Sequence, residues 1–188
     1  MGKKMDRILC FVLLVLEAIG LYISISSRKW LVFIFYTQLS NMAAAASALF
    51  LVMLGNRPWI ASLRYLSTCM LVLTFIVTVF VLIPMGGSPK QLLFSGNGPY
   101  HHLLCPVLGT ISYIFFEQHC AGSALMLPVI VTLVYGLIML VLNALKIVDG
   151  PYPFFRVHNQ PFQATVLWMV VLLLVTAGIS WVVLRLAP

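Results

Sequence analysis

Four polar residues cluster near the start of the largely apolar stretch Trp30–Leu54, and their types could support chemistry. They are Thr37, Gln38, Ser40 and Asn41. On a helix Thr37, Ser40 and Asn41 share one face, because positions i, i+3 and i+4 point the same way. A threonine hydroxyl becomes a nucleophile only when a base removes its proton. The stretch therefore carries either a candidate nucleophile, Thr37, or a hydrogen-bonded seam between packed helices.

The same face continues into small residues, which are Ala44, Ala45 and Ala48. Small side chains let the backbone of a neighbouring helix come close. We therefore expect the polar face to look into protein and not into lipid. For each polar residue alone, packing is the simpler role. A catalytic role would require a basic side chain at the same depth in the membrane.

Two adjacent histidines, His101 and His102, could provide the base. Histidine is the usual proton acceptor near neutral pH. Consecutive helical residues point about 100° apart, so one ring is expected to face Thr37 while the other orients it or lies at the interface. Gln38 and Asn41 could donate to a developing oxyanion or position the imidazole. Together these residues resemble an acyl-transfer site.

Glu17 lies near the middle of the first apolar run. A carboxylate at that depth is a candidate for function by default. It could equally be a protonated or hydrogen-bonded side chain that joins two helices. In either case we expect it to be protonated or bonded inside the bundle, because an unpaired charge there costs at least a few kcal/mol.

Metal and disulfide chemistry is not predicted, and no cofactor is expected. The chain has no HExxH motif, and the diverging rings of His101 and His102 cannot both join Glu17 at bonding distance to a metal. The cysteines form no CxxC motif and are expected to be buried small hydrophobes. They are Cys10, Cys69, Cys105 and Cys120.

The composition identifies the class of protein that must position these residues. Of 188 residues, 62% are hydrophobic and 8% are charged, with a mean hydropathy of +1.08. A soluble domain carries about a quarter charged residues. The net charge of +7 is spread over helix ends without a polybasic run, so no nucleic-acid partner is predicted. The chain is predicted to be an integral membrane protein.

The predicted fold is all-α, a polytopic bundle of six transmembrane helices in one domain, residues 1–188. A spanning helix needs roughly 20 apolar residues, and glycine- and proline-rich segments separate six such runs. Their approximate ranges are 8–25, 30–54, 60–83, 100–117, 124–147 and 162–186.

Six crossings would bring the candidate residues together. The loops after the first, third and fifth helices would share one side, and the proline- and aromatic-rich loop 149–161 is expected to form a cap there. Thr37, about two turns into its helix, His102 and this loop would then surround one cavity, with Glu17 lining or flooring it.

The opposite side would hold both termini, together with Glu117 and His119. Basic residues flank the first helix at Lys3, Lys4 and Arg7. Positive flanks favour the cytoplasm, so both termini are expected on the cytoplasmic side.

Three short motifs in this order resemble a known family. Tyr36-Thr37 is followed by Ser40, His102 precedes Pro106 by four residues, and Tyr152-Pro153-Phe154 precedes the last helix. Over most of its length the chain is similar to the androgen-induced-gene (FAR-17a/AIG-like) membrane family. It reads more closely like the bacterial relatives, which have an FTxxSN-like helix and an HxxxP helix. The animal members are multi-pass threonine hydrolases that cleave fatty-acid esters of hydroxy fatty acids.

This resemblance implies that Thr37 is the nucleophile and His102 the acid/base. His101 stays a candidate, because counting back from Pro106 against the animal pattern could land there. The remaining candidates for supporting or substrate-binding roles are His101, Gln38, Ser40, Asn41, Glu17, Tyr152 and Phe154. The chain departs from the animal members at Ser40, where they have an aspartate. Its short tails are those of a microbial chain, which implies a bacterial plasma membrane.

The predicted function is therefore an integral membrane hydrolase of lipid acyl esters, with membrane lipids and an acyl-ester substrate as partners. The alternative is a non-enzymatic protein that binds or transports a lipid or small molecule in the same cavity. Inverted repeats would favour a transporter, and none is seen. A third interpretation is a purely structural bundle.

Overall fold

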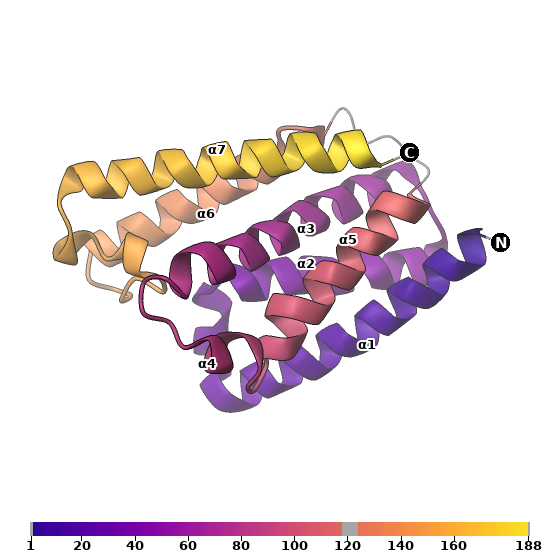
Figure 1. Cartoon of the computed structure of the whole chain (residues 1–188), viewed down its shortest axis with the longest axis horizontal. Coiled ribbons are helices and arrows are strands. Elements are labelled where there is room, and N and C mark those ends of the chain that lie inside the picture. The colour runs from indigo at the N-terminus through magenta and orange to yellow at the C-terminus, as the bar shows by residue number, and fades with distance from the viewer. Residues whose placement is uncertain (1, 118–123, 188) are drawn as a thin grey trace.

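The computed structural model describes residues 2–117 and 124–187, which form helices joined by loops (Figure 1). No strand occurs in these two ranges, so the predicted all-α class is confirmed. The longer helices are α1 (Gly2–Arg28), α2 (Tyr36–Leu54), α3 (Pro58–Val77), α5 (Cys105–Phe116), α6 (Leu127–Ala144) and α7 (Phe162–Leu186). Shorter segments are η1 (Lys29–Ile34), η2 (Thr78–Leu82), α4 (Pro89–Leu93), η3 (Pro99–Leu104), η5 (Pro153–Phe155) and η6 (Val157–Asn159).

Five helical stretches among the described residues are long and apolar enough to cross a membrane. They are Gly2–Ile34, Tyr36–Leu54, Pro58–Leu82, Leu127–Ala144 and Phe162–Leu186. The chain is thus a polytopic helical membrane protein. The segment η3–α5 packs against α1 and α3 and corresponds to the fourth predicted helix, 100–117. Its crossing of the membrane stays a prediction.

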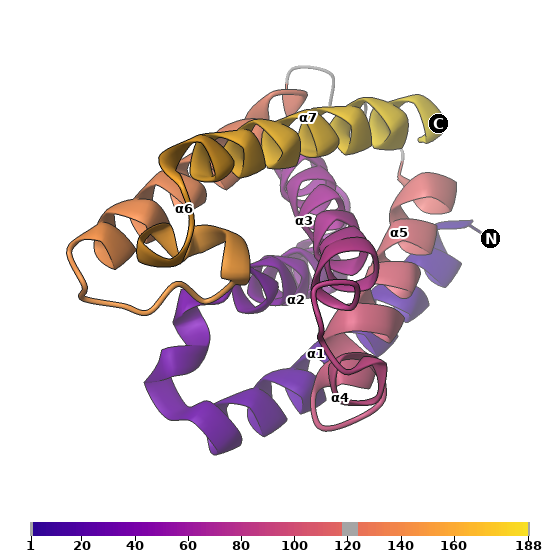
Figure 2. The ribbon, with the colours of Figure 1, turned by 60° about the vertical axis from the view of Figure 1, so that its left-hand side comes forward.

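The helices fall into two groups that share α3. Helices α1, α2, α3 and α5 pack on one another, whereas α6 and α7 form a hairpin that contacts the first group chiefly through α3. Figures 1 and 2 show α3 lying between this hairpin and the pair α1 and α5. The start of α1 and the end of α7 lie at one end of the bundle, and the loops that follow η2 and α6 lie at the other (Figure 1).

The predicted continuous helix 30–54 is wrong at its start. Residues Lys29–Ile34 form a 3₁₀ segment, Phe35 is extended with φ −87° and ψ 130°, and α2 begins at Tyr36. The N–H groups of a helix's first turn have no partner within the helix. Here the hydroxyls of Tyr135 and Tyr152 accept hydrogen bonds from the N–H groups of Tyr36 and Thr37, at 3.1 and 3.3 Å. Thr37 therefore lies in the first turn of α2 and not two turns inside a helix.

A widened turn carries the two histidines. Segment η3 is a π-helical turn in which the Cys105 N–H bonds to the Tyr100 carbonyl, five residues back. Pro106 has no N–H group and cannot make the α-helical hydrogen bond to the His102 carbonyl. The turn before it can therefore widen into a π-helical turn without losing that bond.

A buried charge cluster joins α1, α3 and α5 at the end of the bundle that holds the termini. The Arg64 guanidinium lies 2.8 Å from an Asp6 carboxylate oxygen and 2.7 Å from a Glu117 carboxylate oxygen. It also donates to the Ser112 hydroxyl at 3.0 Å. Glu117 is therefore at the predicted end, far from Thr37, while His119 lies outside the described residues.

The cysteines are small buried residues, as predicted, wherever the structure describes them. Cys10, Cys69 and Cys105 are buried free thiols. Cys120 lies outside the described residues.

Candidate functional site

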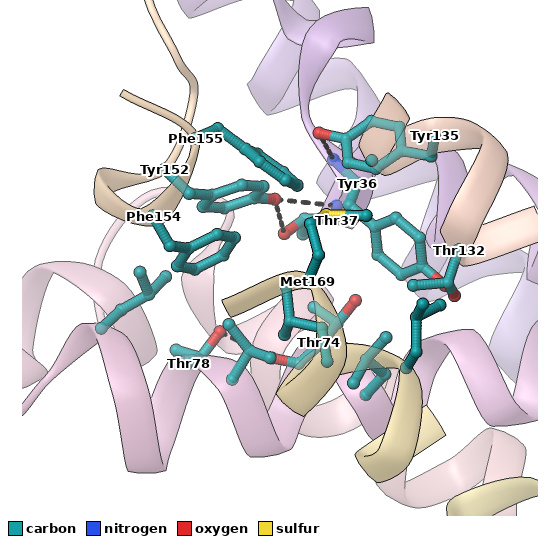
Figure 3. Close-up of a pocket in the computed structure, with 16 residues that line it drawn as sticks. Tyr36, Thr37, Thr74, Thr78, Thr132, Tyr135, Tyr152, Phe154, Phe155 and Met169 are labelled. Atoms are coloured by element: carbon teal, nitrogen blue, oxygen red, sulfur yellow. Dashed lines mark hydrogen bonds between the residues drawn. The ribbon is translucent and has the colours of Figure 1, made fainter. Parts of the chain in front are cut away.

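Thr37 and Tyr152 meet at the start of α2. Thr37 is buried, with 7% of its surface exposed. The Tyr152 hydroxyl lies 3.3 Å from both the backbone nitrogen and Oγ1 of Thr37, as Figure 3 shows. The Tyr152 ring stacks on Phe154, with centroids 5.2 Å apart and planes 13° apart. The fold thus brings the predicted residues Thr37, Tyr152 and Phe154 together.

The Tyr152 hydroxyl keeps its proton at neutral pH. Burial raises the pKa of Tyr152, and its hydrogen bonds with Thr37 oppose this shift but do not cancel it. An un-ionised phenol can accept one hydrogen bond and donate another. Tyr152 accepts from the Thr37 N–H, so its own O–H remains available to donate to Thr37 Oγ1 or to a ligand oxygen.

A narrow apolar pocket of about 40 Å³ lies beside Thr37 between α2, α3, α6, α7 and the loop 149–161. Several hydroxyls in it already bond to the protein: Tyr36 to Thr132 at 2.8 Å, and Thr78 to the Thr74 carbonyl at 2.8 Å. The rest of the wall is mostly carbon, including Phe155 and Met169 (Figure 3). An apolar lining of this kind suits an apolar part of a ligand.

A second, more polar pocket lies on the other side of Thr37 and is called the vestibule here. Its volume is about 380 Å³. Its lining residues include Arg28, Thr37, Gln38, Leu82, Asn97, His102, Pro151, Tyr152 and Pro153. Thr37, Leu82 and Tyr152 line both pockets. The prediction that Thr37, His102 and the aromatic loop surround a common cavity is confirmed.

His102 lines the vestibule, and its contact with Thr78 defines which of its ring nitrogens is basic. Its Nδ1 lies 3.3 Å from Thr78 Oγ1. The Thr78 hydroxyl donates its proton to the Thr74 carbonyl, so the threonine oxygen must accept from Nδ1–H. In the neutral ring Nε2 then carries the free lone pair, because only one nitrogen of a neutral imidazole is protonated. No histidine nitrogen of the described residues is within hydrogen-bond distance of Thr37 Oγ1, whose partner is Tyr152.

His101 lies elsewhere, with no exposed surface, between α1 and α2. Its Nδ1 is 3.3 Å from the amide nitrogens of both Gln38 and Asn97. Its Nε2 lies 3.7 Å from Glu17 Oε2. Gly20 makes room for this ring, because a Cβ atom at position 20 would overlap the imidazole.

The expectation that Glu17 lines or floors the cavity is wrong. Glu17 is absent from the walls of both the apolar pocket and the vestibule. The imidazole of His101 fills the space that Gly20 leaves on α1, and it thereby separates Glu17 from the vestibule.

Ser40 and Asn41 hold the first turn of α2. The Ser40 hydroxyl and the Asn41 amide donate to the Thr37 carbonyl at 2.9 and 2.6 Å. The shared face of Thr37, Ser40 and Asn41 is thus confirmed. Asn41 Nδ2 is directed at this carbonyl, and Gln38 Nε2 at His101, so neither amide nitrogen is aimed at an oxyanion beside Thr37.

Sequence reasoning missed Thr132 and Tyr135 on α6 as parts of the site. Tyr135 accepts from the Tyr36 N–H and donates to the Ile34 carbonyl at 2.7 Å. The signal was present, because Thr132 and Tyr135 lie three residues apart on an otherwise apolar helix. This is the same helical spacing that singled out Thr37 and Ser40.

The fold and this site together define a polytopic membrane protein with a buried, hydroxyl-lined site between an apolar pocket and a polar vestibule. No protein-family model, no curated protein and no solved structure matches the chain. In the described residues, no group of three or more His, Cys, Asp and Glu side chains is placed to hold a metal ion.

Proposed function

We propose that the chain is an integral membrane hydrolase that cleaves acyl esters of lipids, with Thr37 as nucleophile and His102 as acid/base. One observation carries this proposal: Thr37 lies where the apolar pocket meets the vestibule. An acyl ester has an apolar chain on one side of its carbonyl and a more polar portion on the other. A chain in the apolar pocket would therefore leave its ester carbonyl beside Thr37.

The proposal includes membership of the androgen-induced-gene (FAR-17a/AIG-like) family, in its bacterial form, on the strength of the motifs around Thr37, His102 and Tyr152. Fatty-acid esters of hydroxy fatty acids are then the first substrates to test. The same resemblance implies a bacterial plasma membrane.

In the proposed first step, His102 Nε2 takes the Thr37 proton, directly or through one vestibule water. Thr37 Oγ1 forms a bond to the ester carbonyl carbon. The bond from that carbon to the alcohol oxygen then breaks, and the alcohol leaves with the proton held by His102. In the second step water attacks the acyl-threonine, gives a proton to His102, and releases the fatty acid as Thr37 recovers its proton.

Tyr152 supplies the donor that this chemistry needs. Its hydroxyl is protonated and lies 3.3 Å from Thr37 Oγ1. Turning from Thr37 to the ester oxygen, it would stabilise the charge that develops there. The Thr37 N–H, released from the phenol oxygen, would be a second donor at the start of a helix, where the dipole favours negative charge.

The experiment compares purified variants on a panel of acyl esters and follows covalent labelling by intact-mass spectrometry. Thr37→Ala should abolish ester hydrolysis and labelling by a fluorophosphonate, with little change in melting. Thr37→Ser should retain part of the activity, since it keeps the oxygen. His102→Ala should be nearly as damaging as Thr37→Ala, and the double variant no worse, because nucleophile and base act as a unit.

Thr110 provides a matched control. Its hydroxyl bonds to the Pro106 carbonyl of its own helix at 2.7 Å, and it is not part of either pocket wall. Thr110→Ala should leave hydrolysis and labelling unchanged. Unimpaired turnover by Thr37→Ala would contradict the proposed nucleophile.

A second candidate function is non-enzymatic binding or transport of a lipid in the same cavity. It is favoured by one observation: the Thr37 hydroxyl bonds to Tyr152 and not to a histidine. A binding protein would retain lipid without turnover or adduct, and Thr37→Ala would weaken that retention. Mass spectrometry of lipid extracted from the purified protein distinguishes the two, since a hydrolase turns over added ester and a carrier does not.

A further inference from the structure

Two titratable side chains, Glu17 and His101, are completely buried against each other and have no part in the proposed ester chemistry. Both have 0% exposure, with His101 Nε2 and Glu17 Oε2 3.7 Å apart. Neither carboxyl oxygen of Glu17 nor Nε2 of His101 has a hydrogen-bond partner among the nitrogen and oxygen atoms of the described residues, and the Cys105 thiol is the polar group that contacts the Glu17 carboxyl. Buried polar groups are nearly always partnered, so these three atoms call for a physical explanation.

The ring of His101 is neutral on geometric grounds. Its Nδ1 faces the amide nitrogens of Gln38 and Asn97, both at 3.3 Å. Amide nitrogens only donate, so Nδ1 is an acceptor and its lone pair is in use. The ring proton is then on Nε2, which points toward Glu17.

Among the described residues, no lysine or arginine acts on Glu17. From α5 the Cys105 thiol contacts it, and from η3 the side chains of Tyr100 and His101 lie against Gly20 of α1. The groups on α2 that face His101 are the uncharged Gln38 and Asn41. Arg28 lines the vestibule, and Arg64 is engaged with Asp6 and Glu117. A buried carboxylate beside a neutral imidazole would be costly.

We infer that Glu17 and His101 form a buried proton-binding site, in which Glu17 is held as the neutral acid and the imidazole of His101 connects it to the vestibule. The site would store one proton inside the bundle. This inference does not depend on the hydrolase proposal, because it concerns a different pair of side chains.

Proton access to this site is from the vestibule side. Asn97 and Gln38, which contact His101 Nδ1, line the vestibule. Toward the N-terminus of α1, away from the vestibule, the helices pack through an apolar cluster. It consists of Cys10, Leu13, Ala48, Leu51, Ile60 and Cys105. A proton arriving at Nδ1 makes the ring an imidazolium, which passes its Nε2 proton to the Glu17 carboxylate and is left neutral with its proton on Nδ1. In the reverse path the Glu17 acid returns a proton to Nε2, and Nδ1 releases its proton toward the vestibule. Gln38 Oε1 has no partner, so a turned amide can accept from the protonated Nδ1.

Isotope labelling can test the protonation state directly, because the chain contains two glutamates, Glu17 and Glu117. Protein made by cell-free synthesis with carboxyl-¹³C glutamate should show, at neutral pH, the isotope-shifted infrared carbonyl band of a protonated acid. The band should vanish in Glu17→Gln and persist in Thr37→Ala. A wild-type spectrum without this band, or a band that survives in Glu17→Gln, would overturn the inference.

Hydrogen–deuterium exchange of the same band tests the route. In deuterated buffer the band should shift as the acid proton is replaced. His101→Gln should slow this replacement by about 100-fold, the lower end of what a positioned proton-transfer group contributes. His102→Gln, a matched variant of the neighbouring ring, should keep the wild-type rate. Should His101→Gln fail to fold, Gln38→Leu tests the same path and should also slow the exchange. Wild-type exchange in the folded variant would refute the route.

Discussion

The Tyr152 hydroxyl contacts both the amide and the hydroxyl of Thr37. Its removal should therefore lower the rate of ester hydrolysis much more than it lowers stability. Tyr152→Phe keeps the ring that stacks on Phe154. We expect ester hydrolysis to fall by about 100-fold, the usual loss for one oxyanion donor. Stability should fall by only about 1 kcal/mol, the typical value of one hydrogen bond. Steady-state kinetics and detergent melts measure the two effects.

Tyr65 offers a matched control for this prediction. Its buried hydroxyl donates to the Ser180 carbonyl at 2.8 Å, away from both pockets. Tyr65→Phe should lower stability by a similar amount and leave hydrolysis at the wild-type rate. Equal losses of activity in the two variants would show that the phenol of Tyr152 acts only through the fold.

The raised pKa of Tyr152 also predicts a pH dependence of stability. A tyrosine in the unfolded chain ionises near pH 10, whereas burial raises the pKa of Tyr152 above this value. The folded state therefore holds the proton more tightly, and the associated stability is present below about pH 10 and lost as the pH rises further. Wild type should lose stability relative to Tyr152→Phe in melts above about pH 10. A difference independent of pH would contradict this prediction.

At the scale of the helices, Gly20 sets the distance between α1 and η3. A Cβ atom at this position would overlap the His101 ring, so Gly20→Ala should displace the imidazole and cost about 1–3 kcal/mol, as overpacking does. Gly178 on α7 is the control, because a Cβ atom there would meet nothing within 4 Å. Gly178→Ala should be neutral or stabilise the helix by up to about 1 kcal/mol. Detergent melts of the two variants provide the comparison.

Removal of the buried Arg64 guanidinium should destabilise the packing of α1, α3 and α5. Arg64→Met would leave the Asp6 carboxylate and its Glu117 neighbour in a buried setting without their shared guanidinium. Breaking a buried pair in this way costs about 3–5 kcal/mol. Arg57→Met, a change at an exposed position, should have little effect. Similar melts for the two variants would contradict the prediction.

Most helix ranges could be predicted because apolar runs and their glycine and proline breakers are local signals. The break at Phe35 could not, since Trp30–Leu54 reads as one continuous apolar run. It is stabilised by hydroxyls 99 and 115 residues further along the chain. No local pattern contains that information.

The candidate site was predictable to a similar extent. Thr37, Tyr152 and His102 carried recognisable motifs, and the structure places them around one vestibule. The separate environments of His101 and His102 could not be predicted, because they depend on the space at Gly20 and on the Thr78 hydroxyl. Both features arise only when α1, α3 and η3 pack together.

For the whole molecule, the number of membrane crossings can be tested. The beginning of α1 and the end of α7 lie at one end of the bundle (Figure 1), so we predict an even number of crossings, with η3–α5 crossing in addition to the five longer stretches. Reporter fusions at the two termini should therefore give the same topology signal. Opposite signals would mean that only the five longer stretches cross.

The tyrosine hydroxyls that complete the first turn of α2 also have a consequence for biosynthesis. They belong to α6 and to the loop after it, so they leave the ribosome about a hundred residues later than Thr37. A nascent chain that has inserted α1 to α5 already contains the threonine but neither phenol. The proposed nucleophile would thus stay without its partner until the last helical hairpin docks, and unfinished chains in the membrane would lack the complete candidate site.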